Sequence, residues 1–155
     1  MGDMVFNSGY AASTIFPSAE LKTFEEVGTW VDRRLMVLFA GAMAEALNGN
    51  NVEVDAAHGI LRTTAKNDYG KIREYLRLLR NMNFSIGTEA EMNEQLERLY
   101  FTIGEKSADL VRKYRGQIKE LVGEILPTLT EKGGGTFTKQ RIEALPFIQK
   151  LKPHS

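Results

Sequence analysis

The stretch Leu35–Asp68, LMVLFAGAMAEALNGNNVEVDAAHGILRTTAKND, organises the rest of this 155-residue chain. Its most apolar segment, residues 35–44, predicts a helix that is covered on several sides. The Asn-Gly-Asn-Asn run at 48–51 ends that helix, because Gly and Asn tolerate the left-handed conformation of a C-cap. Residues 52–64 have no strong period and predict a connection. The Asn-Asp pair that closes the stretch can supply the N-cap of the next helix.

The apolar helix begins upstream of this stretch. Thr23 and Glu26 have the spacing of a capping box at a helix N-terminus. Apolar residues then recur in steps of three and four, which is the period of one helix face: Phe24, Val27, Val31, Leu35, Leu38 and Ala42. The sequence therefore predicts one helix from Thr23 to the turn that begins at Asn48.

Downstream, two more helices are predicted. The first runs to about Asn83, with its buried stripe at Ile72, Leu76, Leu79 and Met82. A second capping box, Thr88 with Glu91, opens a helix of about 35 residues that reaches Pro127 and spans roughly 50 Å at the standard rise. Bends or a break in it are expected at one of three glycines, Gly104, Gly116 or Gly123.

The two ends of the chain carry weaker patterns. Residues 1–19 predict a loosely ordered arm with a short strand around Met4–Phe6. Residues 131–135 predict a flexible link, after which Thr138 caps a short helix that Pro146 closes. The fold prediction is therefore an all-α bundle of four or five helices with one long helix. It forms a single domain over residues 20–148, followed by a frayed tail at 149–155.

Composition narrows the function classes. The formal net charge is zero, so no global field favours nucleic acid or anionic lipid, and nucleic-acid binding is not expected. Cysteine is absent, which removes disulfides and thiolate metal sites and fits a reducing cytoplasm. The ten apolar residues at 35–44 are too few to span a bilayer. With no secretory signal evident either, we expect a cytoplasmic protein.

Four segments follow one another in an order known from a protein family. They are residues 35–47 (LMVLFAGAMAEAL), 63–68 (TTAKND), the long helix from residue 89, and 136–145 (TFTKQRIEAL). The order resembles the C-terminal helical portion of the peptidase domain of FtsH-type ATP-dependent zinc metallopeptidases. The resemblance covers about residues 20–145, and it implies a helical peptidase-like fold and self-association, since family peptidase domains assemble as rings.

The resemblance also implies a metal ligand. In the family, zinc is held by two histidines of an H-E-x-x-H helix and by the aspartate of the Asn-Asp pair, whose counterpart is Asp68. Here the segment before Asp68 holds one histidine, His58, with no glutamate beside it, and no G-x-x-x-x-G-K-[ST] motif occurs. Asp68 is thus either a surviving zinc ligand or a capping or first-turn carboxylate. His58 is either a ligand or base, or a solvated or locally bonded loop histidine beside Gly59.

Other candidate residues have two interpretations. Arg73, Arg77 and Arg80 share one side of a predicted helix, which is typical of a solvated face but also of a patch for an anion or an acidic partner. Aromatic residues at helical spacing, which include Tyr69, Tyr75, Tyr100 and Phe101, predict core and rim positions rather than base stacking.

The absence of the zinc ligands and of the glutamate base leads to the function hypothesis. A catalytic zinc site needs three protein ligands and a glutamate base, and the chain offers too few of them. We therefore expect a catalytically inactive FtsH-peptidase-like protein, a pseudoenzyme that acts as a protein-interaction or regulatory module without a cofactor. The alternative is a zinc metallopeptidase, or a fragment of one, in which Asp68 binds the metal.

Overall fold

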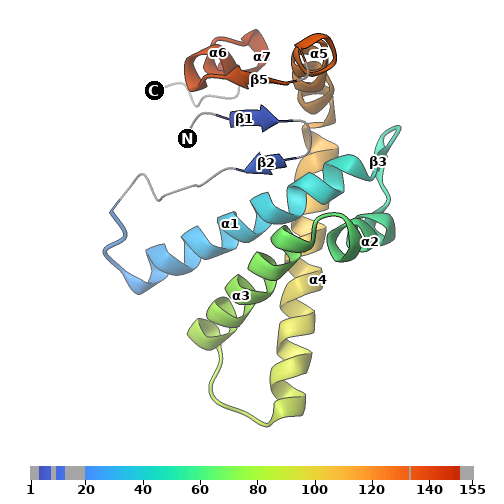
Figure 1. Cartoon of the computed structure of the whole chain (residues 1–155). Coiled ribbons are helices and arrows are strands. Elements are labelled where there is room, and N and C mark those ends of the chain that lie inside the picture. Colours follow the sequence, from blue (N-terminus) through green and yellow to red (C-terminus); the bar gives the residue numbers. More distant parts are fainter. Residues whose placement is uncertain (1–3, 8–9, 13–19, 133, 151–155) are drawn as a thin grey trace. The chain divides into compact units, whose positions relative to one another are not determined.

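The chain is helical apart from short strands, as the computed structural model shows over residues 4–7, 10–12, 20–132 and 134–150 (Figure 1). The prediction of an all-α, bundle-like fold with a long helix is confirmed. Contacts between residues divide the chain into two units, one formed by residues 21–115 and the other by residues 1–20 together with 116–155.

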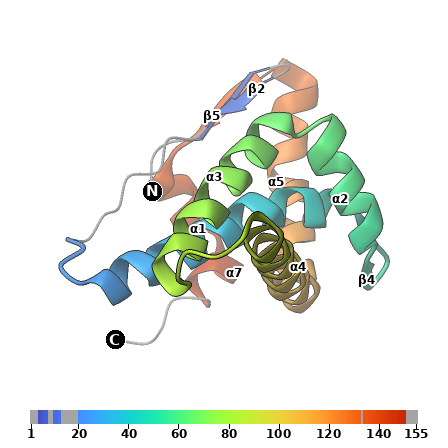
Figure 2. The same cartoon turned by 90° about the horizontal axis from the view of Figure 1, so that it is seen from below.

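The first unit contains four helices and a small hairpin. The helices are α1 (Phe24–Glu45), α2 (Val54–Thr63), α3 (Lys66–Asn83) and α4 (Glu89–Lys113), and the hairpin joins β3 (Leu47–Asn48) to β4 (Asn51–Val52). Figure 2 looks along α4 and shows α1, α2 and α3 gathered beside it. The core between these helices is made of fully buried side chains, which include Phe39, Leu35, Met43, Leu61, Ile72, Ile103 and Val31. Most of the buried positions of α1 are those that its apolar period predicts.

Both predicted capping boxes are present. The Thr23 hydroxyl accepts a hydrogen bond from the amide of Glu26 at 3.1 Å, and the Glu26 carboxylate accepts one from the amide of Thr23 at 2.9 Å. Thr88 and Glu91 exchange the same pair of bonds at the start of α4. Each box satisfies amides that a helix N-terminus leaves without partners.

The segment after α1 differs from the prediction. Residues 54–63 form helix α2 rather than a connection, and its buried side, Ala57, His58 and Leu61, covers little more than one turn. The helix also lacks the capping box that marks the starts of α1 and α4, because its N-cap is Glu53 and no side chain in the described residues caps it. The predicted helix C-cap at 48–51 is wrong, because this run closes the β3–β4 hairpin, with Gly49 at a φ of +60°. Helix α1 itself stops at Glu45.

The N-cap prediction for the next helix is wrong. Helix α3 begins at Lys66, its N-cap is Ala65, and no side chain caps it. Asp68 instead lies in the first turn, where a carboxylate interacts favourably with the positive end of the helix dipole.

The predicted 35-residue helix is two helices. Helix α4 ends at Lys113, and α5 spans Arg115–Lys132 with Pro127 inside it. The break falls at Tyr114, two residues before one of the expected glycines, Gly116. The Arg115 guanidinium donates to the carbonyl of Arg112 at 2.8 Å, which satisfies one of the carbonyls that the end of α4 leaves without a helical donor.

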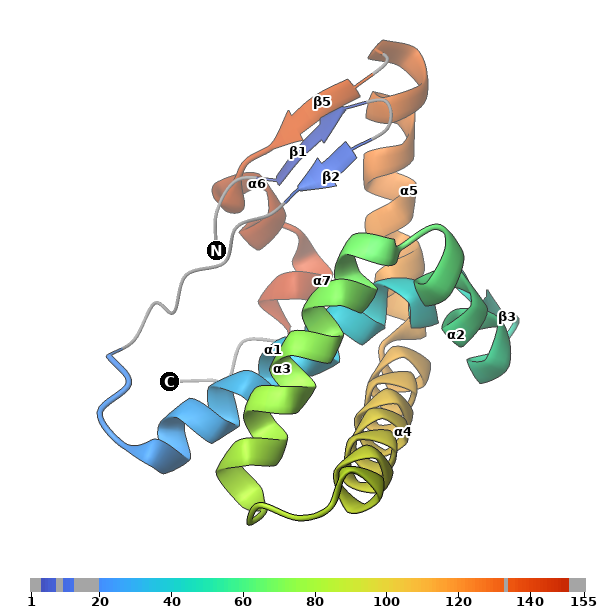
Figure 3. The same ribbon diagram turned by 60° about the horizontal axis from the view of Figure 1, so that its bottom comes forward.

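The second unit contains α5 and a three-stranded antiparallel sheet. Strand β1 (Met4–Asn7) lies between β2 (Tyr10–Ala12) and β5 (Gly134–Phe137), as Figure 3 shows. The predicted strand near the N-terminus is therefore confirmed. The predicted link at 131–135 is wrong, because α5 continues to Lys132 and β5 begins two residues later.

Two short helices follow β5. Helix α6 (Lys139–Glu143) begins at the predicted cap, where the Thr138 hydroxyl accepts from the amide of Arg141 at 3.2 Å. Helix α7 (Pro146–Gln149) ends within the predicted tail, whose residues 151–155 lie outside the described part of the chain. None of the helices in the described ranges combines the length and the apolar character that crossing a membrane requires.

Candidate functional site

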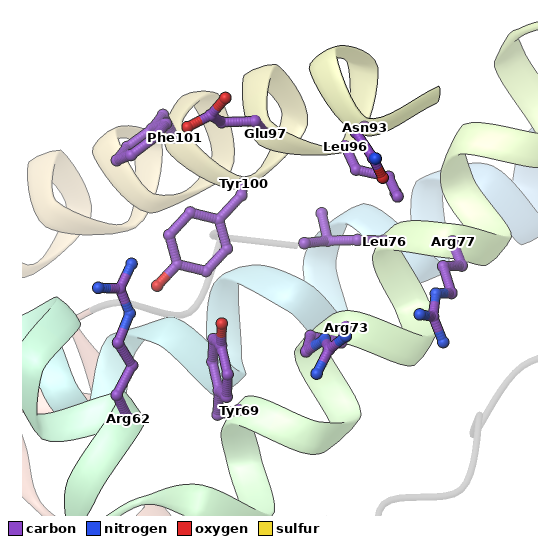
Figure 4. Close-up of a pocket in the computed structure, with 10 residues that line it drawn as sticks. All are labelled: Arg62, Tyr69, Arg73, Leu76, Arg77, Asn93, Leu96, Glu97, Tyr100 and Phe101. Atoms are coloured by element: carbon purple, nitrogen blue, oxygen red, sulfur yellow. The ribbon is translucent and has the colours of Figure 1, made fainter. Parts of the chain in front are cut away.

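A pocket of about 350 Å³ lies among α2, α3 and α4 in the first unit (Figure 4). We call it the arginine–tyrosine pocket. Its lining comes from α2 (Arg62), α3 (Tyr69, Arg73, Leu76 and Arg77) and α4 (Asn93, Leu96, Glu97, Tyr100 and Phe101). The volume lies at the lower end of the range for small-ligand sites.

Helical spacing sets the order of side chains along this pocket. Tyr69, Arg73 and Arg77 are successive fourth residues of α3 and therefore share one face, with a rise of about 6 Å from each to the next. Figure 4 shows Arg62, Tyr69 and Tyr100 gathered at one end and Arg77 near Asn93 at the other. The α2–α3 side of this groove therefore carries a row of cations, Arg62, Arg73 and Arg77.

The lining has an excess of positive charge. Arg62, Arg73 and Arg77 contribute three guanidinium groups, against one carboxylate from Glu97. Within the described residues, none of these four side chains makes a hydrogen bond or an ion pair, whereas Arg98 outside the pocket is paired with Glu94 at 3.0 Å. The arginines are therefore available to an anionic ligand.

A buried histidine supports one wall of the pocket. His58 is 6% exposed, and its Nδ1 atom lies 2.9 Å from the hydroxyl oxygen of Tyr100. Its Nε2 atom is buried and has no hydrogen-bond partner. The rings of Phe39, Tyr100 and Phe101 surround the imidazole at centroid distances of 5.0–6.4 Å.

Burial keeps both members of this pair neutral. It lowers the pKa of His58, with the charge of Arg62 acting in the same direction against the opposing effects of Asp55 and Glu105. Burial also raises the pKa of the Tyr100 hydroxyl, assisted by Tyr69. The pair is therefore an uncharged imidazole beside an uncharged phenol at neutral pH.

The histidine prediction needs correction. His58 was expected in a loop beside Gly59, either solvated or locally bonded, but both residues belong to α2, and the imidazole packs against α1 and α4. Asp68 is half-buried in the first turn of α3. Over the described ranges, no cluster of three or more histidine and carboxylate side chains is arranged to hold a metal ion. A zinc role for Asp68 or His58 stays a prediction.

The arginine patch is partly as expected. Arg73 and Arg77 line the pocket, but Arg80 is not on a solvated face: it is 4% exposed and bonded to Gln95 and to the carbonyl of Ser85. Sequence reasoning missed Arg62 and Glu97. Arg62 could be found only once α2 was recognised as a helix, because that helix carries it to the pocket.

A second hollow, of about 440 Å³, lies among α1, α3 and α4. Its lining includes Glu25, Asp32 and Lys106 together with apolar side chains such as Met82 and Leu99. The mixed charges give it no preference for a ligand of one sign, so the arginine–tyrosine pocket is the stronger candidate.

Comparison with known proteins identifies no relative of this chain. No family model, curated protein or solved structure matches the chain.

Proposed function

We propose that the chain is a non-catalytic interaction module that binds an acidic segment of a partner protein in the arginine–tyrosine pocket. The observation that supports this most directly is the convergence of Arg62, Arg73 and Arg77 on one groove in which only Glu97 carries negative charge. Guanidinium groups present a fork of donors that matches a carboxylate and binds it through charge-assisted hydrogen bonds.

The spacing of two arginines on α3 suits an extended segment. Arg73 and Arg77 lie about 6 Å apart along α3, and alternate residues of an extended chain lie roughly 6.6 Å apart. Two carboxylates at alternate positions of a peptide can therefore meet two successive arginines.

Apolar lining supplies the rest of the binding surface. Leu76 of α3 and Leu96 and Phe101 of α4 also line the pocket, and Phe101 is 47% exposed. Aromatic and arginine side chains in a hollow are typical of the residues that dominate binding energy at protein interfaces. The groove therefore offers both a charged edge and an apolar floor to a peptide.

The proposal does not depend on the resemblance to FtsH-type peptidases. That relationship, the self-association it implies and the alternative of a zinc metallopeptidase stay predictions. The expectation of an interaction module, which came from the missing zinc ligands, is now tied to named residues.

Fluorescence anisotropy with a labelled eight-residue peptide of alternating glutamate and glycine tests the proposal. We expect binding that weakens as salt is added, since the charges are exposed, and no binding of the matched peptide of alternating glutamine and glycine. The double variant Arg73→Ala/Arg77→Ala should lose about ten-fold or more in affinity.

The matched control is Arg33→Ala/Arg98→Ala, which removes the same charge from exposed positions outside the pocket lining. We expect it to change the affinity by about two-fold or less at physiological salt. Equal losses in the two double variants would show that only the overall charge matters and would overturn the proposed site.

A further inference from the structure

We infer that Tyr100 donates a hydrogen bond to a carboxylate in the pocket, and that His58 is the positioning residue that keeps the phenol in this role. The inference rests on the proposed function, since it names the group of the acidic segment that binds at the Arg62 end of the groove. The three arginines of the pocket do not account for the buried contact between His58 and Tyr100.

The direction of the bond between His58 and Tyr100 decides what the phenol can do. A neutral imidazole carries one hydrogen, on Nδ1 or on Nε2. If Nδ1 were the acceptor of the Tyr100 hydrogen, the imidazole hydrogen would sit on Nε2, which is buried without any partner. A buried N–H group without an acceptor is rare in proteins and costly.

The other tautomer avoids this cost. With the hydrogen on Nδ1, His58 donates to the Tyr100 oxygen, and Nε2 is an unprotonated nitrogen packed against aromatic carbon. An unused lone pair is the smaller penalty, because no donor is wasted. The hydroxyl oxygen of Tyr100 then has an incoming hydrogen bond, and its own hydrogen is free to point to another acceptor.

That acceptor lies on the pocket side. Figure 4 shows the Tyr100 ring extending from α4 toward Arg62, with the Tyr69 hydroxyl directed into the same space. The two tyrosine rings meet edge to face at a centroid distance of 6.4 Å. Two phenol hydroxyls and one guanidinium therefore lie at this end of the pocket. Within the described residues, none of the three makes a hydrogen bond, apart from the contact of the Tyr100 oxygen with His58.

A carboxylate fits this set of donors. It accepts at several lone-pair positions on two oxygens, so it can take hydrogen bonds from Tyr100, Tyr69 and Arg62 together. Two phenol hydroxyls and one guanidinium match the acceptor positions of a single carboxylate, and the proposed function places acidic side chains in this groove. We therefore assign this end of the groove to the side chain of a glutamate or aspartate rather than to a phosphorylated residue.

The tautomer of His58 can be read without any ligand. Long-range ¹H–¹⁵N correlation spectra of the free protein distinguish a protonated from an unprotonated imidazole nitrogen, and a His154→Gln variant assigns the signals, since the chain has two histidines. We expect hydrogen on Nδ1. Hydrogen on Nε2 would overturn the inference, because Tyr100 would then be committed to His58 as a donor.

Binding of the glutamate–glycine peptide provides the second readout. Tyr100→Phe should lower the affinity about ten-fold, the usual effect of losing a hydrogen bond to a charged group, whereas Tyr75→Phe, which removes a hydroxyl outside the pocket, should leave it unchanged. His58→Leu should weaken binding as Tyr100→Phe does. His58→Asn, which can place an amide donor near the Nδ1 position, should restore part of the affinity.

The outcomes separate this inference from the proposed function. If the wild-type protein does not bind the peptide, the proposed function fails and the inference fails with it. If the wild type binds and Tyr100→Phe binds equally well, only the inference fails. A matched peptide of alternating phosphoserine and glycine that binds more tightly than the glutamate peptide would overturn the assignment to a carboxylate.

Discussion

The Nη2 atom of Arg80 donates a hydrogen bond to the carbonyl oxygen of Ser85 at 2.7 Å. This contact ties the end of α3 to the loop that leads into α4, and the same side chain donates through Nε to Gln95 at 2.9 Å. Arg80 is 4% exposed, so its charge is placed where hydrogen bonds must replace water. It therefore helps to fix α3 and α4, the two helices that supply most of the pocket lining.

Replacing Arg80 should destabilise the protein. Arg80→Ala removes the donors to Ser85 and Gln95 and leaves both acceptors to find other partners, so we expect a loss of about 2–3 kcal/mol in the free energy of unfolding. Urea denaturation followed by circular dichroism measures the loss.

Arg98→Ala is the matched control, since Arg98 forms only an exposed pair with Glu94. We expect it to change the stability by about 0.5 kcal/mol or less. Equal effects of the two variants would mean that Arg80 does not hold the loop.

Helical glycines with open space beside them should tolerate alanine. Gly59 in α2 and Gly70 in α3 have no atom within 4 Å of an added Cβ. Gly59→Ala and Gly70→Ala should each raise the free energy of unfolding by about 0.5–1 kcal/mol, because alanine loses less conformational freedom in a helix. Thermal unfolding measures the gain.

Gly104 provides the contrast within α4. A Cβ there would lie 3.4 Å from His58 and 3.5 Å from Phe39, so a larger residue meets the buried aromatic cluster. Gly104→Val should destabilise the protein by about 1–3 kcal/mol, the usual range for an overpacked core. A stable valine variant would show that the cluster can shift to make room.

The parts of the fold that the sequence predicts well are those with a strong local signal. Two capping boxes placed the starts of α1 and α4, and the long apolar period gave the buried face of α1. These features depend on residues within a few positions of one another. Helix α2 has no such box, since its N-cap is Glu53 without a capping side chain, and its buried His58 contacts Tyr100, 42 positions away.

The residues of the candidate site also divide into those with a local signal in the sequence and those whose position depends on tertiary contacts. The spacing of Arg73, Arg77 and Arg80 predicted one side of a helix, either a solvated face or a patch for an anion or an acidic partner. Arg80 has the same spacing and is nevertheless buried, because the loop after α3 folds back to offer it the carbonyl of Ser85. Spacing gives the face of a helix, and only the tertiary structure determines which neighbours cover it.

Zinc content tests the alternative of a metallopeptidase. We expect protein incubated with zinc and then desalted to retain none by mass spectrometry, because Nδ1 of His58 is bonded to Tyr100 and Nε2 is buried. About one zinc per chain that is lost in Asp68→Ala would contradict this expectation and support the metallopeptidase prediction. Asp55→Ala is the matched control, since it removes a first-turn carboxylate from α2.

Stability should depend on the titration of His58. The pKa of this imidazole is lowered below its ordinary value of 6.5, chiefly by burial, so the unfolded chain binds a proton at a higher pH than the folded chain does. The contribution of the neutral His58 to the free energy of unfolding should therefore be complete above about pH 6.5. It should fall as the pH decreases below this value.

Urea midpoints between about pH 7.5 and about pH 5 measure this loss. The pKa values of Glu26 and Glu91 are lowered from 4.5 by the amides of their capping boxes, so their contribution to stability is lost only at still lower pH. His58→Asn should flatten the profile over this range. His154→Gln should leave the slope that His58 produces, and a flat profile in that variant would show that His58 does not titrate differently in the folded and unfolded states.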